Sequence, residues 1–123
     1  MDRRLGDRRP VTWLHLTWEV DRRARWKTRR VEERLIGLDV SVSGMRAAAR
    51  TVPGLVVGST VAVNLNDHVA RARIQRVEPD EDPEVSVYGM QFIEPPADFV
   101  EALFVQAGEE PSDKAEEFWR RAT

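Results

Sequence analysis

The sequence predicts a mainly β domain, in which about six or seven short strands form an antiparallel barrel or a sandwich, with a helix behind them. Three observations support this fold class. Apolar and polar residues alternate along several segments, turn residues separate these segments at hairpin spacing, and the pattern becomes helical after Pro95-Pro96. The length of 123 residues fits one domain, and a hydrophobic fraction of 41% is sufficient for a core.

The first half of the chain contains two patterned strands joined by a charged connection. After Pro10 the alternation begins at Val11, and one face of the first strand carries Leu14, Leu16, Trp18 and Val20. Arg22–Arg30 is interpreted as a solvated hairpin that extends the positive field. The segment 34–42 predicts the next strand, with the even-numbered positions from Ile36 facing inward and Gly44 ending it.

The second half predicts a hairpin and a final strand. The segment 60–65 alternates, Asn66-Asp67 is a plausible tight turn, and His68–Val77 alternates again. An acidic stretch with two prolines, Glu78–Glu84, predicts a solvated loop. The segment 85–92 then forms the last strand of the predicted barrel or sandwich.

Beyond the two prolines the apolar residues follow a helical stripe formed by Phe99, Val100, Leu103 and Phe104. Gly108 is expected to end this helix, and Ser112 is a candidate cap for a second short helix that runs to Arg121. The predicted organisation is therefore a flexible arginine-rich leader over residues 1–10, a barrel domain with its helix over 11–107, and a helical extension over 108–123.

Composition excludes several classes of function. The chain has no cysteine and two histidines without ligand spacing, so a metal site is not expected. It shows neither an apolar run of membrane-spanning length nor a secretory signal, so we expect no membrane insertion and a cytoplasmic location. Neither an acid–base pair nor a catalytic triad is recognisable, which disfavours an enzyme and leaves no catalytic residue to name.

The charge is distributed unevenly along the chain. Residues 1–50 hold 13 Lys and Arg against 7 Asp and Glu, whereas residues 51–123 hold 6 against 14. A basic half beside an acidic half favours a local anionic ligand over general nucleic-acid binding, although the two halves could also simply attract each other in the fold. The acidic second half therefore weighs against the alternative of single-stranded nucleic-acid binding by a small barrel.

Two short motifs carry the functional prediction. The first is the arginine pair Arg4 and Arg8, flanked by Arg3 and Arg9, and the guanidinium group can contact phosphate oxygens or the O6/N7 edge of guanine. Taken alone, such a cluster could be a disordered basic tail.

The second motif is Asp39-x-Ser41-x-x-Gly44, which leaves a predicted strand. A carboxylate can accept two parallel hydrogen bonds from N1–H and the exocyclic amine of guanine. The serine, on the same strand face, could donate to a phosphate oxygen, and the glycine permits an unusual backbone angle and close ligand approach. Taken alone, these residues are also common in turns.

An Arg-x-x-x-Arg pair ahead of a strand, followed about thirty residues later by Asp-x-Ser-x-x-Gly, resembles the PilZ domain family. The resemblance covers roughly residues 3–105 and includes Gly89-Met90-Gln91-Phe92-Ile93, which is similar to the last barrel strand of that family. It implies a six-stranded antiparallel β-barrel with a C-terminal α-helix. It also implies a ligand, the bacterial second messenger cyclic di-GMP.

The resemblance also implies a role for each motif residue. Arg4 and Arg8 would take guanine edges and phosphates, Asp39 would bind a guanine base, and Ser41 and Gly44 would line the phosphate side. An arginine just before the first motif arginine is associated in the family with two stacked ligand molecules. Arg3 stands there, which favours a stacked pair, and Arg9 is a possible additional contact.

The leading functional hypothesis is a non-enzymatic receptor, in which cyclic di-GMP orders the arginine leader and so changes contact with an unidentified protein partner. The alternative is a nucleotide-independent adaptor of the same fold for motility or secretion machinery. The sequence leaves a monomer and a homodimer equally open.

Overall fold

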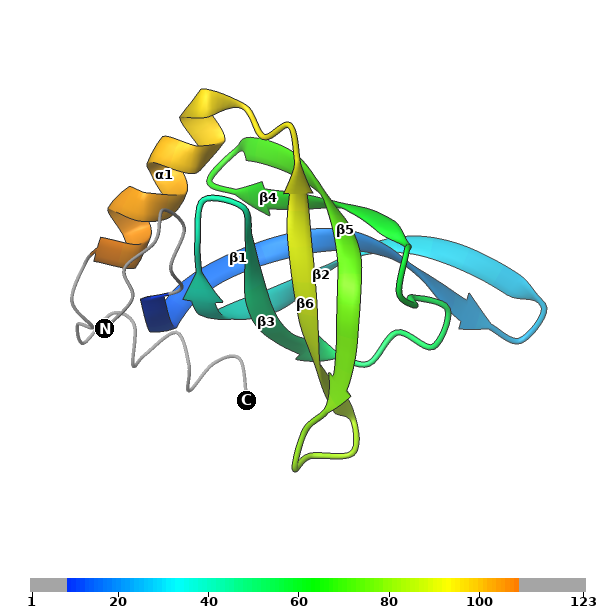
Figure 1. The fold of residues 1–123 in the computed structure, drawn as a ribbon. Helices are drawn as coiled ribbons and strands as arrows, with labels where there is room; N and C mark the ends of the chain where they lie inside the picture. The colour runs from blue at the N-terminus through cyan, green and yellow to red at the C-terminus, as the bar shows by residue number, and fades with distance from the viewer. Residues whose placement is uncertain (1–8, 109–123) are drawn as a thin grey trace.

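The structure, a computed structural model, describes residues 9–108, with the backbone alone for residues 9–13 and Ala24. Six antiparallel strands close into a barrel in the order β1-β2-β3-β6-β5-β4, and one helix follows them (Figure 1). The closed barrel confirms the predicted six-stranded fold with its C-terminal helix and decides against a sandwich. The elements are β1 (Arg9–Ala24), β2 (Lys27–Val40), β3 (Gly44–Arg50), β4 (Thr60–Leu65), β5 (His68–Pro79), β6 (Val85–Ile93) and α1 (Ala97–Gly108).

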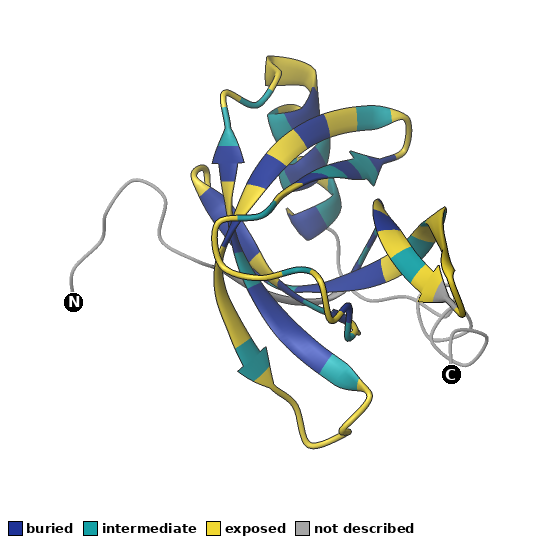
Figure 2. Ribbon diagram, turned by 90° about the vertical axis from the view of Figure 1, so that its right-hand side faces the viewer, coloured by how far each residue is buried: buried dark blue, intermediate teal, exposed yellow. Residues whose placement is uncertain are grey.

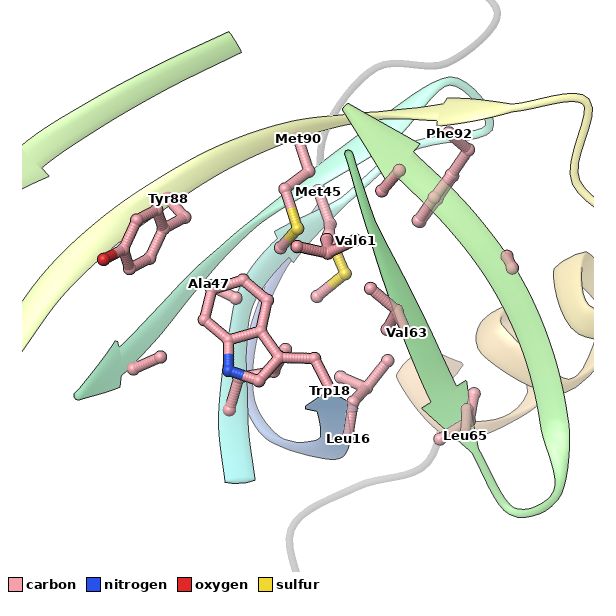
Figure 3. Packing of buried hydrophobic residues seen from close by; sticks show 14 of the residues in the cluster. Leu16, Trp18, Met45, Ala47, Val61, Val63, Leu65, Tyr88, Met90 and Phe92 are labelled. Carbon is pink, nitrogen blue, oxygen red and sulfur yellow. The ribbon is translucent and has the colours of Figure 1, made fainter. Parts of the chain in front are cut away.

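Buried residues fill the barrel interior, and they alternate with more exposed ones along β1, β4 and the first half of β5, as the period of two predicts (Figure 2). Trp18 meets Tyr88 edge-on, with ring centroids 5.1 Å apart, and the Tyr88 hydroxyl accepts a 3.0 Å hydrogen bond from the amide of Val52. Figure 3 shows Met45 and Met90 side by side near this pair, so that unbranched side chains fill the space between the strands.

Helix α1 packs against the barrel near β1, β4 and β5. Its buried residues are Phe99, Leu103 and Ala107, and Phe99 lies edge-on to Phe92 of β6 at a centroid distance of 5.3 Å. The predicted helical stripe forms α1, which the structure describes as far as Gly108. The predicted helix end at Gly108 and the second predicted helix depend on residues outside the described range. In the described part of the chain, none of the helices combines the length and apolar character needed to cross a membrane.

The inward face predicted for the segment 34–42 is only partly correct, because β2 contains a bulge. Gly37 pairs with Ala47 but Asp39 pairs with Arg46, so β2 has one residue more than β3 at this point. An extra residue reverses the inside–outside alternation. Ile36 and Val40 are buried as predicted, and Leu35, which was placed on the opposite face, belongs to the core as well. The predicted inward residue Val42 lies beyond the end of β2 and is half exposed at 51%.

Strand β3 was not predicted from the sequence. Its centre is Ala47-Ala48-Ala49, and three identical small residues give no contrast between an apolar and a polar face. Gly44 thus both follows the turn after β2 and begins the next strand, with seven registered pairs to β6.

Strands β1 and β2 are both longer than predicted and form a ribbon that projects from the barrel (Figure 1). Arg9, the first described residue, and Pro10 already belong to β1, and the last pair of this strand is Ala24 with Lys27. The charged segment predicted as a hairpin is thus the outer part of this ribbon, with a turn at Arg25-Trp26. Arg25 takes a positive φ of 57° there.

Candidate functional site

The register of β1 and β2 brings the chain that follows the arginine motif next to the Asp-x-Ser-x-x-Gly motif. Arg9 pairs with Val40, and Pro10 pairs with Asp39. The backbone that follows the N-terminal arginines is therefore laid directly beside the Asp-x-Ser-x-x-Gly motif. This neighbourhood comes from the antiparallel pairing of two segments that are thirty positions apart in the chain.

The residues after Asp39 form a tight turn between β2 and β3. The amide of Ser41 donates to the carbonyl oxygen of Gly44 at 2.8 Å, and the amide of Gly44 donates back to Ser41 Oγ at 3.2 Å. Ser41 Oγ also lies 3.2 Å from Ser43 Oγ. Ser41 is only 2% exposed, so its hydroxyl holds the turn together in this structure.

Gly44 is required by the close approach of β6 rather than by an unusual backbone angle. A Cβ atom at this position would overlap the carbonyl oxygen of Met90. In the described residues the glycine with positive φ is Gly58, so Gly44 has an ordinary backbone conformation. The expectation of an unusual backbone angle at Gly44 was therefore wrong.

Asp39 forms an ion pair with Arg46 of β3. Arg46 Nε donates to Asp39 Oδ2 at 2.6 Å, and the side chains are 44% and 11% exposed, respectively. The pair follows from the register, because Asp39 and Arg46 are cross-strand partners beyond the bulge. The bulge thus fixes both the direction of the carboxylate and the identity of its partner.

An open pocket of about 500 Å³ lies beside this ion pair, on the outer surface of β3, β5 and β6. Arg46 and Arg76 place two guanidinium groups in its lining, and Gln75 donates to Gln91 across it at 2.9 Å. A second bulge, between Ile74 and Arg76, breaks the alternation of β5, so that Gln75 and Arg76 are both exposed. The remaining lining residues are Ser43, Gly89, Met90 and Gln91.

The structure brings together Asp39, Ser41 and Gly44, as the sequence predicted. Arg3, Arg4 and Arg8 lie outside the described residues, and of Arg9 the backbone alone is described. Sequence reasoning missed Arg46 and Arg76. A cation two residues after Gly44 and another inside the alternating segment His68–Val77 are weak signals, because their meeting depends on the register of three strands.

Chemically, this surface can recognise a ligand that carries both hydrogen-bond donors and negative charge. The Asp39 carboxylate accepts hydrogen bonds, and the guanidinium groups of Arg46 and Arg76 attract phosphate. Across residues 9–108 there is no cluster of three His, Asp or Glu side chains suited to a metal ion. These groups support the binding of such a ligand.

Comparison with known families agrees with this geometry. A family model described as the PilZ domain matches residues 2–106, which include both motifs and all six strands. No curated protein matches the chain.

Proposed function

The chain belongs to the PilZ domain family, whose members are binding and adaptor domains, and we propose that it is a receptor for cyclic di-GMP. The observation that carries the proposal is the pairing of Pro10 with Asp39. This pairing lays the chain that follows the N-terminal arginines beside the carboxylate motif, which supports the proposal that one ligand is bound by both.

Chain length makes this contact feasible for both motif arginines. Arg8 directly precedes Arg9, and Arg4 stands five residues before it. A fully extended chain spans about 3.5 Å per residue, so Arg4 reaches at most ~18 Å from the start of β1, before the length of its own side chain is added. Neighbouring strands lie about 4.8 Å apart, so β3 and β6, the second and third strands from β1 in the barrel order, are within this range.

In the proposed complex, Asp39 accepts hydrogen bonds from the Watson–Crick edge of one guanine, while Arg4 and Arg8 contact the O6/N7 edge and the phosphates. Arg46 orients the Asp39 carboxylate, and with Arg76 it adds positive charge on the pocket side. Ser41 and Gly44 contribute through the shape of their turn, which lines the phosphate side of the site. Arg3 and Arg9 would add contacts if two ligand molecules stack.

Ligand binding would then alter the surface that a protein partner contacts. Ligand draws the arginine segment over the barrel, and a nearby protein contacts the new surface. The residues do not identify this partner, which we define only as a protein whose affinity depends on the ligand.

The proposal is tested by calorimetric titration with cyclic di-GMP. Arg8→Ala and Asp39→Asn should each abolish measurable binding while preserving the circular dichroism spectrum and the melting temperature. Arg71→Ala and Glu101→Gln are matched controls, because both side chains are exposed and lie outside the pocket. A wild-type isotherm in either site variant would refute the assignment. If the wild type itself does not bind, the nucleotide-independent adaptor becomes the better hypothesis.

A further inference from the structure

The outer end of the β1–β2 ribbon is strongly basic. Residues 21–30, here called the hairpin tip, contain six Lys and Arg and one acid, Asp21. The residues next to the hairpin tip still belong to the barrel, because Val20 is buried and Val31 packs against the core. The hairpin tip therefore starts where the barrel core ends. Figure 1 shows the hairpin tip extending beyond the other strands.

Most of this charge is not neutralised by the barrel. Arg30 pairs with Asp21 at 3.2 Å, and Arg22 pairs with Glu33 at 2.7 Å. Arg23, Lys27 and Arg29 are exposed, and the structure shows no ion pair for them within residues 9–108. The hairpin tip therefore presents a positive field to whatever approaches it.

At the turn of the hairpin tip stands Trp26, whose side chain is 85% exposed. The guanidinium carbon of Arg25 lies 5.9 Å from the centroid of its ring, which is a weak cation–π contact. An exposed indole is stabilised when its apolar body is removed from water while its N–H group stays hydrated. This is the environment of a membrane–water interface, where tryptophan is enriched.

The cations are distributed over both faces of the ribbon. Cross-strand pairs share a face, so Arg22 and Arg29 lie on one face and Arg23 lies on the other. A binding groove for a strand of nucleic acid would place cations and several stacking aromatic rings along one face. The hairpin tip instead has a single aromatic ring at its turn and cations on both faces. This arrangement suits contact with a planar anionic surface that the turn meets first.

We propose that the hairpin tip binds the surface of an anionic lipid bilayer, with Trp26 at the level of the headgroups and Lys27 and Arg29 attracted to the lipid phosphates. The contact is peripheral and does not depend on cyclic di-GMP. The candidate ligand site lies at the opposite end of the ribbon, about 40 Å away at ~3.3 Å per residue from Lys27 to Asp39, and so remains open to solvent.

The test is flotation of the full chain with vesicles of phosphatidylcholine alone or mixed with phosphatidylglycerol. Binding is expected with the mixed vesicles and should fall steeply with salt. Lys27→Gln/Arg29→Gln should weaken binding by about twenty-fivefold, on the basis of about fivefold for each cation near the surface. Trp26→Ala should weaken it without changing the salt dependence.

The matched control is Arg71→Gln/Arg73→Gln, which removes the same charge from exposed positions on β5 and should leave binding unchanged. Circular dichroism would establish that every variant is folded. Equal binding to both kinds of vesicle, or equal loss in the control, would overturn the proposal. So would hairpin-dependent binding of a single-stranded oligonucleotide or of polyglutamate without binding of vesicles.

Discussion

The two ends of the β1–β2 ribbon are built in opposite ways. At the inner end, Asp39 and Ser41 are buried polar residues whose hydrogen-bonding groups are engaged by Arg46 and by the turn. At the outer end, Trp26 and the cations around it are exposed. The inner end thus has its geometry fixed before any ligand arrives, whereas the outer end has charge without fixed geometry.

The difference shows what kind of recognition each end can provide. A fixed carboxylate beside guanidinium groups can distinguish one base edge from another, because direction matters in hydrogen bonding. Exposed cations around an indole distinguish a surface only by the sign of its charge and by whether it offers a membrane–water interface. Variants that affect one end and spare the other are the direct test of this contrast.

The largest effect is expected at Gly44. An added methyl group at this position would overlap the Met90 carbonyl, so β3 and β6 must separate, and Gly44→Ala should lower the free energy of unfolding by about 3 kcal/mol or more. Urea titration measures this loss. Gly54→Ala is the control, because its added Cβ would meet nothing within 4 Å. Equal stability of the two variants would show that Gly44 does not hold the barrel closed.

Arg46→Ala should have the next largest effect. It leaves the mostly buried Asp39 carboxylate without its 2.6 Å ion-pair partner and removes a cation from the pocket. We expect a loss of stability of about 1 kcal/mol, since Arg46 is itself largely exposed. Affinity for cyclic di-GMP should fall by about tenfold, as calorimetry would measure. Tighter binding would mean instead that Arg46 competes with the ligand for Asp39.

A pH-dependent contribution is expected where the ribbon leaves the barrel. The hydrogen bond from Arg22 lowers the pKa of Glu33 in the folded protein, despite the opposing effect of burial. The ionised carboxylate therefore stabilises the fold above the pKa of an unfolded glutamate, about 4.3. This contribution is lost as the pH falls through the lower, folded pKa.

Unfolding of the wild type and of Glu33→Gln, followed in urea at several pH values, measures this linkage. The difference between them should be about 1 kcal/mol at neutral pH and should shrink towards pH 3. Glu101→Gln is the control, because Glu101 is exposed on α1. A difference that does not vary with pH would assign the effect of Glu33 to packing instead.

The smallest effect on stability is expected at the hairpin tip. Trp26 is exposed and touches none of the core, so Trp26→Ser should change the free energy of unfolding by less than about 0.5 kcal/mol. Thermal unfolding would measure it. A large loss would show that the ribbon needs its tip in order to fold, and the contrast between the two ends would then fail.

Much of this architecture could be predicted from the sequence, because alternation and turn residues are local signals. The hairpin around Asn66-Asp67 is an example, and both residues take the positive φ that a tight turn requires. The bulges in β2 and β5 could not be predicted, since a bulge is set by the register with a neighbouring strand. The alanine run of β3 lacked any alternating signal.

The same distinction applies to the candidate site. Asp39, Ser41 and Gly44 are close in sequence and form a recognisable motif, and the turn that unites them is local. Arg46 and Arg76 become neighbours of that motif only through pairing across β2, β3, β6 and β5. The sequence therefore revealed the part of the site whose spacing is local and concealed the part that depends on barrel closure.

The opposite burial of Trp18 and Trp26 has an optical consequence. Trp18 is 1% exposed and lies edge-on to Tyr88, the single tyrosine of the chain, whereas Trp26 faces water. A buried indole emits at shorter wavelength than a hydrated one and is shielded from soluble quenchers. With Trp13 and Trp119 replaced by phenylalanine, the fluorescence of this ribbon would report barrel integrity and the surroundings of the hairpin tip as two separate signals, without any attached dye.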